Sequence, residues 1–252
     1  MDRIRFFILT KILKKNHSKL IFDFDDAVFL KPFNSCEDII RNADAVFAGS
    51  HYLLEYAKKN NNNSFLIPTP VDLPKAFPVK REKNIFKIGW LGSESNFKYL
   101  YEIEDELYKA LNSFDSQLLI MSSSEPNFKK IAFKFFKWGI EEERFFLEEL
   151  HAGIMPLSQG EWEKGKCAYK VLKYMSYGAV PLATAFGENI FVIKDGFSGF
   201  LIRKKEDWFF YLNFLYSNRT QMEKMSAYAY EEAKNFSREK IVFLQAEILK
   251  KI

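Results

Sequence analysis

The chain has 252 residues, of which 48% are hydrophobic and 28% charged, a composition typical of a globular protein with one large or two modest domains. A net charge of +4 without a clustered basic stripe argues against nucleic-acid binding, and no apolar run reaches the roughly 18 residues of a membrane-spanning helix. Cys36 and Cys167 lie far apart, and no segment resembles a secretory signal, so we expect free thiols in a cytoplasmic protein.

The first 20 residues combine apolar and basic side chains at helical spacing. A helix of this kind suits peripheral contact with the inner face of an anionic membrane. A surface helix packed on its own sheet explains the pattern equally simply and is the preferred interpretation.

Strands and helices alternate over the first part of the chain. The expected strands are residues 19–24, 45–48 and 64–67, and the expected helices are residues 35–42 and a helix capped by Ser50. This alternation predicts a parallel sheet.

The alternation restarts after a proline-rich stretch. The expected strands are residues 86–91, 117–121, 152–157, 180–184 and 199–202. The expected helices are residues 97–111, 127–138, 141–149, 166–176, 190–193, 205–216, 221–236 and 238–251.

The fold class predicted from this order is α/β, with two Rossmann-like parallel-sheet domains, of which the first is partial. The expected division is residues 1–75 for the partial first domain, 76–84 for a linker, 85–236 for a complete second domain and 237–252 for a terminal helix that packs back on the first part.

Polar and glycine-rich stretches follow three strands of the second domain, where an open parallel sheet binds its ligands. Gly92 and Ser93 follow the first of these strands, and Gly187, Glu188 and Asn189 follow a later one. Taken alone, the first pair of residues is a weak signal and the second stretch suits an ordinary tight turn. The dinucleotide fingerprint is absent, which argues against a dehydrogenase.

Lys166 and Lys170 are the most informative pair of residues. The expected helix 166–176 places both at its start and on one face, where cations oppose the helix dipole. A bound anion would explain them, and a solvated lysine-rich helix is the alternative.

The second domain resembles the C-terminal domain of the family 4 (group 1) glycosyltransferases, which have the GT-B fold. The resemblance rests on the stretches F-K-I-G-W-L-G-S, G-I-M-P-L, G-K-C-A-Y-K-V-L-K-Y-M-S-Y-G-A-V-P-L-A-T, F-G-E-N and D-G-F-S-G-F-L-I. The first part is similar to the end of that family's N-terminal domain, with F-D-F-D-D-A, A-D-A-V-F-A-G-S and I-P-T-P-V-D.

The resemblance implies a hexosyltransferase of the EC 2.4 class that transfers a sugar, usually with retention, from a nucleotide-diphosphate-sugar donor to a glycan or lipid-linked acceptor of a cell-surface polysaccharide. It implies no cofactor and no required metal, since the nucleotide sugar is a substrate. The family's N-terminal domain is longer, so Met1 is expected to lie inside a domain.

The resemblance also implies site residues. The implied catalytic residues are Lys98, Lys170 and Asp26, although helix capping or a structural hydrogen bond is the preferred role of Asp26. The implied donor-binding residues are Gly92, Ser93, Lys166, Lys170, Lys173, Tyr174, Gly187, Glu188 and Asn189.

The sequence departs from the family at the two positions of its Glu-x7-Glu pair, which are Gly165 and Lys173 here. The second glutamate usually binds the donor ribose, and Lys166 and Lys170 could compensate by holding the diphosphate. The alternative function is therefore a non-catalytic nucleotide-sugar-binding remnant, or a partner of a separate acceptor-domain subunit.

Overall fold

The computed structural model describes residues 18–32, 34–74, 77, 81 and 84–252. The chain divides into two units. The first comprises residues 1–70, 159–167 and 238–252, and the second comprises residues 71–158 and 168–237. The expected basic helix of the first 20 residues lies almost wholly outside the described residues.

The first unit is built on a three-stranded parallel sheet. Its strands are β1 (Ile21–Phe24), β2 (Ala45–Ala48) and β3 (Ser64–Leu66), in the order β1-β2-β3. Its helical elements are η1 (Val28–Leu30), α2 (Cys36–Asn42), α3 (His51–Lys58), α7 (Glu161–Lys164) and α12 (Arg238–Leu249).

Both faces of this small sheet are covered. Side chains of α2 and α3, such as Ile40 and Leu53, form one core with the sheet. In a second core, on the other face, Ile241 and Ile248 of α12 pack with Phe47 of β2. Ser50 caps α3 as expected, since its hydroxyl accepts a hydrogen bond from the Leu53 amide at 3.3 Å.

The second unit contains a six-stranded parallel sheet in the order β6-β5-β4-β7-β8-β9. Its strands are β4 (Phe86–Leu91), β5 (Ser116–Ser122), β6 (Lys134–Lys137), β7 (Ala152–Met155), β8 (Val180–Thr184) and β9 (Phe200–Ile202). Its helical elements are η2 (Glu94–Asn96), α4 (Phe97–Glu102), α5 (Glu104–Ser113), α6 (Ile140–Glu149), α8 (Tyr169–Ser176), α9 (Asn189–Val192), α10 (Asp207–Ser217), α11 (Arg219–Ala233) and η3 (Lys234–Phe236).

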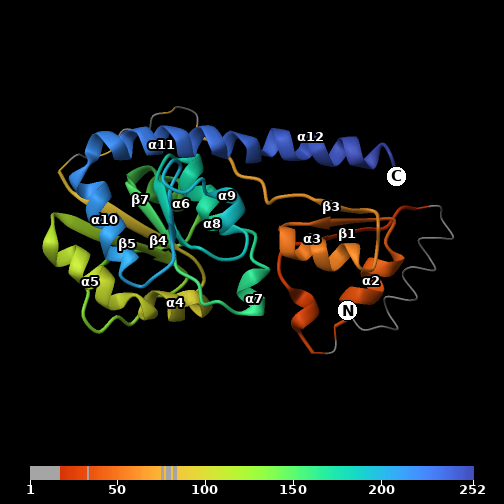
Figure 1. Ribbon diagram of the computed structural model, residues 1–252, viewed down its shortest axis with the longest axis horizontal. Coiled ribbons are helices and arrows are strands. Elements are labelled where there is room, and N and C mark those ends of the chain that lie inside the picture. Colours follow the sequence, from red (N-terminus) through yellow and green to blue (C-terminus); the bar gives the residue numbers. More distant parts are fainter. Residues whose placement is uncertain (1–17, 33, 75–76, 78–80, 82–83) are drawn as a thin grey trace. The chain divides into compact units, whose positions relative to one another are not determined.

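Helices cover both faces of the six-stranded sheet (Figure 1). The helices α4, α5 and α10 contribute to the core on one face, and α6 and α8 contribute to the core on the other. The strand order reverses between β4 and β7, because the chain first builds outward to β6 and then returns beside β4. This arrangement is a doubly wound α/β sheet, and its switch point lies between β4 and β7.

The structure corrects three expected elements. The expected helix 127–138 is wrong, because its end forms the edge strand β6, whose Phe135 and Phe136 pack into cores on opposite faces of the sheet. The expected helix 97–111 is interrupted at Ile103, which separates α4 from α5.

The third correction concerns the helix expected to begin at Lys166. The helix α8 begins at Tyr169, and Ala168 before it has a left-handed backbone with φ of 52°. Lys166 is therefore not part of this helix. The expectation that Lys166 and Lys170 share one helix face is wrong for the same reason.

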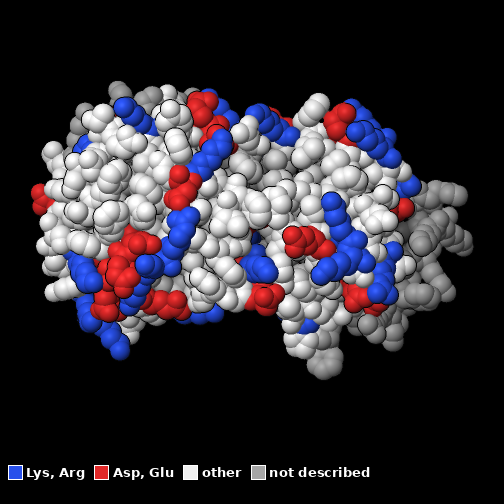
Figure 2. Space-filling model, viewed as in Figure 1, with Lys and Arg blue, Asp and Glu red and all other residues white. Residues whose placement is uncertain are grey.

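Charged side chains of both signs are interspersed on the face shown in Figure 2. Such mixing is typical of a solvated surface. Among the described residues, none of the helices is long and apolar enough to cross a lipid bilayer.

Candidate functional site

The carboxyl ends of β4 and β7 separate from each other at the switch point of the larger sheet. Their ladder pairs Ile88 with Ala152 and Gly89 with Gly153, and ends there. Beyond that point the Tyr174 hydroxyl lies between the strands. It accepts a hydrogen bond from the Leu91 amide at 3.1 Å and donates one to the Ile154 carbonyl at 3.2 Å.

Tyr174 thereby holds the switch point open at a defined width. Its side chain is fully buried, and burial raises the pKa of its hydroxyl. A side chain at position 153 would overlap the Tyr174 ring, so Gly153 is what allows the ring to approach the sheet. We expected Tyr174 to contact the donor; its side chain is fully buried, and its contacts are with the strands.

Gly92 and Lys170 meet at the carboxyl end of β4. The Lys170 ammonium lies 4.3 Å from the centre of the Trp90 ring. A Cβ atom at Gly92 would overlap this ammonium and would come within 2.8 Å of the Trp90 ring. The absence of a side chain at Gly92 therefore lets a cation from α8 reach the end of β4.

Lys170 is the second residue of α8, so its charge lies at the helix N-terminus. The amide groups there and the helix dipole favour an anion, and so does the ammonium. The α8 N-terminus and the β4 loop therefore form a region of positive potential that suits an anion.

Two other predicted residues lie near the end of β4. The Ser93 hydroxyl contacts Ser95 Oγ at 3.0 Å and accepts a hydrogen bond from the Asn96 side-chain amide at 2.7 Å. These contacts order the loop that follows β4. Lys98 is exposed on α4, with its ammonium 4.8 Å from the centre of the Tyr99 ring.

The loop after β8 is tied to the loop after β7. The Thr184 hydroxyl accepts a hydrogen bond from the Leu157 amide at 2.9 Å, and the Thr184 carbonyl accepts one from the Asn189 side chain at 3.0 Å. Gly187 has φ of 57°, a conformation that favours glycine. Glu188 and Asn189 are both buried, so the backbone at Gly187 is the more accessible part of this loop.

The remaining predicted residues belong to the first unit. Asp26 is half-buried at the carboxyl end of β1. Burial raises the pKa of Asp26, nearby Lys166 lowers it, and the charge of Asp25 raises it again, so that the net pKa is above its usual range. Lys166 is thus an electrostatic neighbour of Asp26 within the first unit.

Sequence reasoning missed a group of side chains around Lys173. The Lys173 ammonium forms an ion pair with Glu143 of α6, and both side chains are largely buried. The other Glu143 oxygen accepts a hydrogen bond from the indole of Trp138 at 3.1 Å. Trp138, directly after β6 in K-F-F-K-W-G, was the only available signal, as a large aromatic residue at the end of a strand.

The charge state of Lys173 depends on two opposing effects. Burial by itself would lower the pKa of Lys173, but its bonds to Glu143 and Tyr169 outweigh burial and raise that pKa. The Lys173 ammonium also lies 5.1 Å from the centre of the Tyr169 ring. Lys173 therefore connects α8 with α6.

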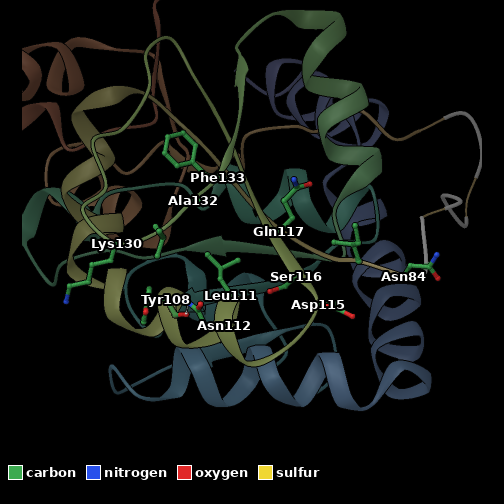
Figure 3. A pocket seen from close by; sticks show the side chains of 12 residues that line it. Asn84, Tyr108, Leu111, Asn112, Asp115, Ser116, Gln117, Lys130, Ala132 and Phe133 are labelled. Atoms are coloured by element: carbon green, nitrogen blue, oxygen red, sulfur yellow. Dashed lines mark hydrogen bonds between the residues drawn. The ribbon is translucent and has the colours of Figure 1, made fainter.

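A cavity of about 640 Å³ lies at the opposite ends of the strands of the larger sheet (Figure 3). Asp115, Ser116 and Ala132 line it, and they stand at or before the starts of β5 and β6. The cavity is thus at the amino ends of the strands and contains none of the predicted site residues. A smaller cavity, of about 330 Å³, lies at the carboxyl ends of the first unit's strands and includes Asp23 and Asp25.

The two parallel sheets with helices packed on them form an α/β fold of the GT-B type, as the matching solved structures show. No protein-family model matches the chain, and no curated protein matches it in sequence. Solved structures of glycosyltransferases do match its fold.

One of these is HepE of Anabaena, solved in complex with UDP and glucose, with a TM-score of 0.74 and 13% identity over 96% of this chain and 74% of HepE. The galactosyltransferase WaaB has a TM-score of 0.70 and 16% identity over 99% of this chain and 73% of WaaB. TarM of S. aureus, solved with UDP, has a TM-score of 0.68 and 16% identity over 92% of this chain and 50% of TarM. Identities this low establish the fold alone.

Proposed function

We propose that this chain is a glycosyltransferase that takes a sugar from a nucleotide-diphosphate donor and transfers it, with retention, to a glycan or lipid-linked acceptor. The observation that carries the proposal is the Lys170 ammonium at the N-terminus of α8, placed against the Gly92 backbone at the sheet's switch point. The complexes of HepE with UDP and with UDP-glucose support a donor of this class.

The chemistry of donor cleavage explains why a cation is needed there. When the bond between the anomeric carbon and the diphosphate breaks, negative charge builds up on the departing phosphate oxygen. A cation already fixed in position stabilises that charge without reorganisation in the transition state. Lys170 and the first amides of α8 supply this stabilisation in the proposal.

We assign the other donor contacts to residues that lie beside the switch point. The ordered loop at Ser93 and the backbone at Gly187 flank the switch point at the ends of β4 and β8. The exposed Lys98 of α4 is a second candidate cation. No metal or cofactor has a step in this proposal.

The test is to replace Lys170 by alanine. We expect Lys170→Ala to weaken UDP-glucose binding by at least about 1.5 kcal/mol, or more than tenfold, because a charge-assisted hydrogen bond to phosphate is lost. Isothermal titration calorimetry measures this change. Lys224→Ala is the matched control, because Lys224 is an exposed lysine on α11. Equal affinity in the parent and in Lys170→Ala would remove Lys170 from the site.

A second candidate function is nucleotide-sugar binding without transfer. Two observations favour it. Gly165 and Lys173 stand where the family that this chain resembles has two glutamates, and Lys173 forms an ion pair with Glu143. Release of free glucose from bound UDP-glucose, followed over hours, separates a slow transferase from a binding protein.

A further inference from the structure

We propose that Glu143 and Trp138 form the nucleoside side of the donor site, with the Glu143 carboxylate accepting hydrogen bonds from the ribose hydroxyls and the Trp138 ring contacting the base. This inference rests on the proposed function, since it assumes that a diphosphate is held at Gly92 and Lys170. It assigns the nucleoside to side chains that no sequence motif identified.

The Glu143 carboxylate is held at both oxygens. One oxygen bonds the Lys173 ammonium, and the other accepts the Trp138 indole N–H at 3.1 Å. The side chains of Glu143 and Lys173 are 15% and 16% exposed, so each keeps a small accessible surface. A carboxylate oxygen accepts two hydrogen bonds, so both oxygens retain capacity for ligand hydroxyls.

Pairing with Lys173 also makes the carboxylate compatible with an anionic ligand. A lone carboxylate would repel a nearby diphosphate, because like charges at short range are unfavourable. The ion pair with Lys173 cancels that charge while leaving oxygen lone pairs as acceptors. Carboxylates fill the same role toward ribose hydroxyls in dinucleotide-binding α/β folds.

The Trp138 ring provides a surface for the base. Although its N–H is bonded to Glu143, 55% of Trp138 is exposed. Stacking of a base on an exposed aromatic ring contributes about 1–3 kcal/mol in single-strand binding proteins. An exposed indole beside an oriented carboxylate thus offers a contact for each half of a nucleoside.

The sheet geometry gives the direction of the nucleoside. In the strand order, β6 is two strands from β4, a separation of about 10 Å at the usual strand spacing. A series of contacts runs in this direction. Tyr169, next to Lys170 in α8, contacts Lys173. Lys173 pairs with Glu143, and Glu143 in turn bonds Trp138. The opposite direction ends at Glu188 and Asn189, whose side chains are buried. The nucleoside therefore extends over β5 toward β6.

The experiment compares three probes on the full chain by calorimetry: UDP, 2′-deoxy-UDP and inorganic pyrophosphate. The parent should bind UDP about tenfold or more tightly than 2′-deoxy-UDP, because one charge-assisted hydrogen bond is lost with the hydroxyl. In Glu143→Gln the two nucleotides should bind almost equally, while the affinity for pyrophosphate stays at the parental value.

A merely structural ion pair would give a different result. Glu143→Gln would then lower thermal stability but leave the ratio of UDP to 2′-deoxy-UDP affinity unchanged, which overturns the inference. Should Glu143→Gln fail to fold because Lys173 is left unpaired, Glu143→Gln combined with Lys173→Gln removes both charges. The ratio of UDP affinity to 2′-deoxy-UDP affinity can also be measured in the parent without any variant. A ratio near one in the parent overturns the inference as well.

The outcomes separate the two proposals. Pyrophosphate binding that depends on Lys170, together with an unchanged nucleotide ratio in Glu143→Gln, leaves the donor site standing and removes Glu143 from it. A parent that binds neither UDP nor pyrophosphate overturns the proposed function, and the nucleoside assignment with it.

Discussion

The Tyr174 hydroxyl replaces strand-to-strand hydrogen bonds at the point where β4 and β7 separate. It satisfies the Leu91 amide and the Ile154 carbonyl, both of which are buried. A buried polar group without a partner costs more than an ordinary hydrogen bond contributes. The hydroxyl thus stabilises an opening that would otherwise leave backbone groups unsatisfied.

Tyr174→Phe tests this role. We expect the free energy of unfolding to fall by about 1–3 kcal/mol, because the ring stays while the amide and the carbonyl lose a partner. Urea denaturation followed by circular dichroism measures the change. The control is Tyr228→Phe on α11, where the side chain is 58% exposed and the effect should stay within about 0.5 kcal/mol. Equal stability of the two variants would show that the hydroxyl is dispensable.

At the scale of elements, the pair of Lys173 and Glu143 connects α8 to α6 on the same face of the larger sheet. The two helices approach the sheet closely because Gly89 and Gly153 leave room for Leu150 and Tyr174. The ion pair then joins these helices near the carboxyl ends of the strands. The position of Glu143 therefore depends on how α6 and α8 pack.

The pH dependence of stability reports on this connection. The pKa of Lys173 in the folded protein is raised above its ordinary value of 10.5. The stability that its charged form contributes is therefore fully present below about pH 10.5 and is lost as the pH rises through the folded pKa. We expect the stability difference between the parent and Lys173→Met to be constant from pH 8 to 10 and to shrink above that range. Denaturant titrations at each pH measure the difference, and one that grows with pH would contradict the ion pair.

At the scale of the whole molecule, the chain builds its two units from interleaved segments. The first unit takes residues 159–167 from between β7 and α8, and it takes α12 from the end of the described chain. Within it, the Ser50 hydroxyl donates to the Gly165 carbonyl at 3.4 Å, and the Cys167 thiol donates to the Asp25 carbonyl at 2.9 Å. Each unit nevertheless has cores of its own.

Ile241→Ala tests whether UDP binding at the proposed donor site is independent of the first unit. Ile241 is buried against the sheet of the first unit, so its truncation should destabilise that unit by roughly 2–5 kcal/mol. Affinity for UDP should stay at the parental value, because none of the proposed donor residues lies in that core. Val242→Ala, at a 53% exposed position, is the control for stability. A matching loss of UDP affinity in Ile241→Ala would show that the donor site depends on the first unit.

Several features of the fold could be predicted because they depend on local patterns. Buried strands such as residues 86–91 are short apolar runs, and the alternation of strands with amphipathic helices predicts a parallel sheet wherever it occurs. The strand β6 escaped this reasoning. Its four residues, K-F-F-K, follow a stretch with helical spacing, and only packing on two different cores makes them a strand.

The candidate site divides in the same way. Gly92 and Lys170 were predicted as site residues because each stands in a short motif next to a strand or a helix start. Lys166 was wrongly placed in the helix. The left-handed backbone at Ala168, after which α8 begins, could not be predicted because the residue there is not glycine. The proposed role of Glu143 could not be predicted, because its ion-pair partner Lys173 lies on α8, far along the chain from α6.

The sequence by itself determined the parallel α/β architecture, since this follows from the periodicity of apolar residues in each segment. It also predicted a ligand site at the carboxyl ends of the strands, because Gly92 and Lys170 each stand in a segment that follows a strand. Only the tertiary structure decided that Tyr174 is a buried support and that Glu143 pairs with Lys173. Such pairings depend on which helix faces meet across the sheet, and that is set by the packing of distant segments rather than by any local pattern.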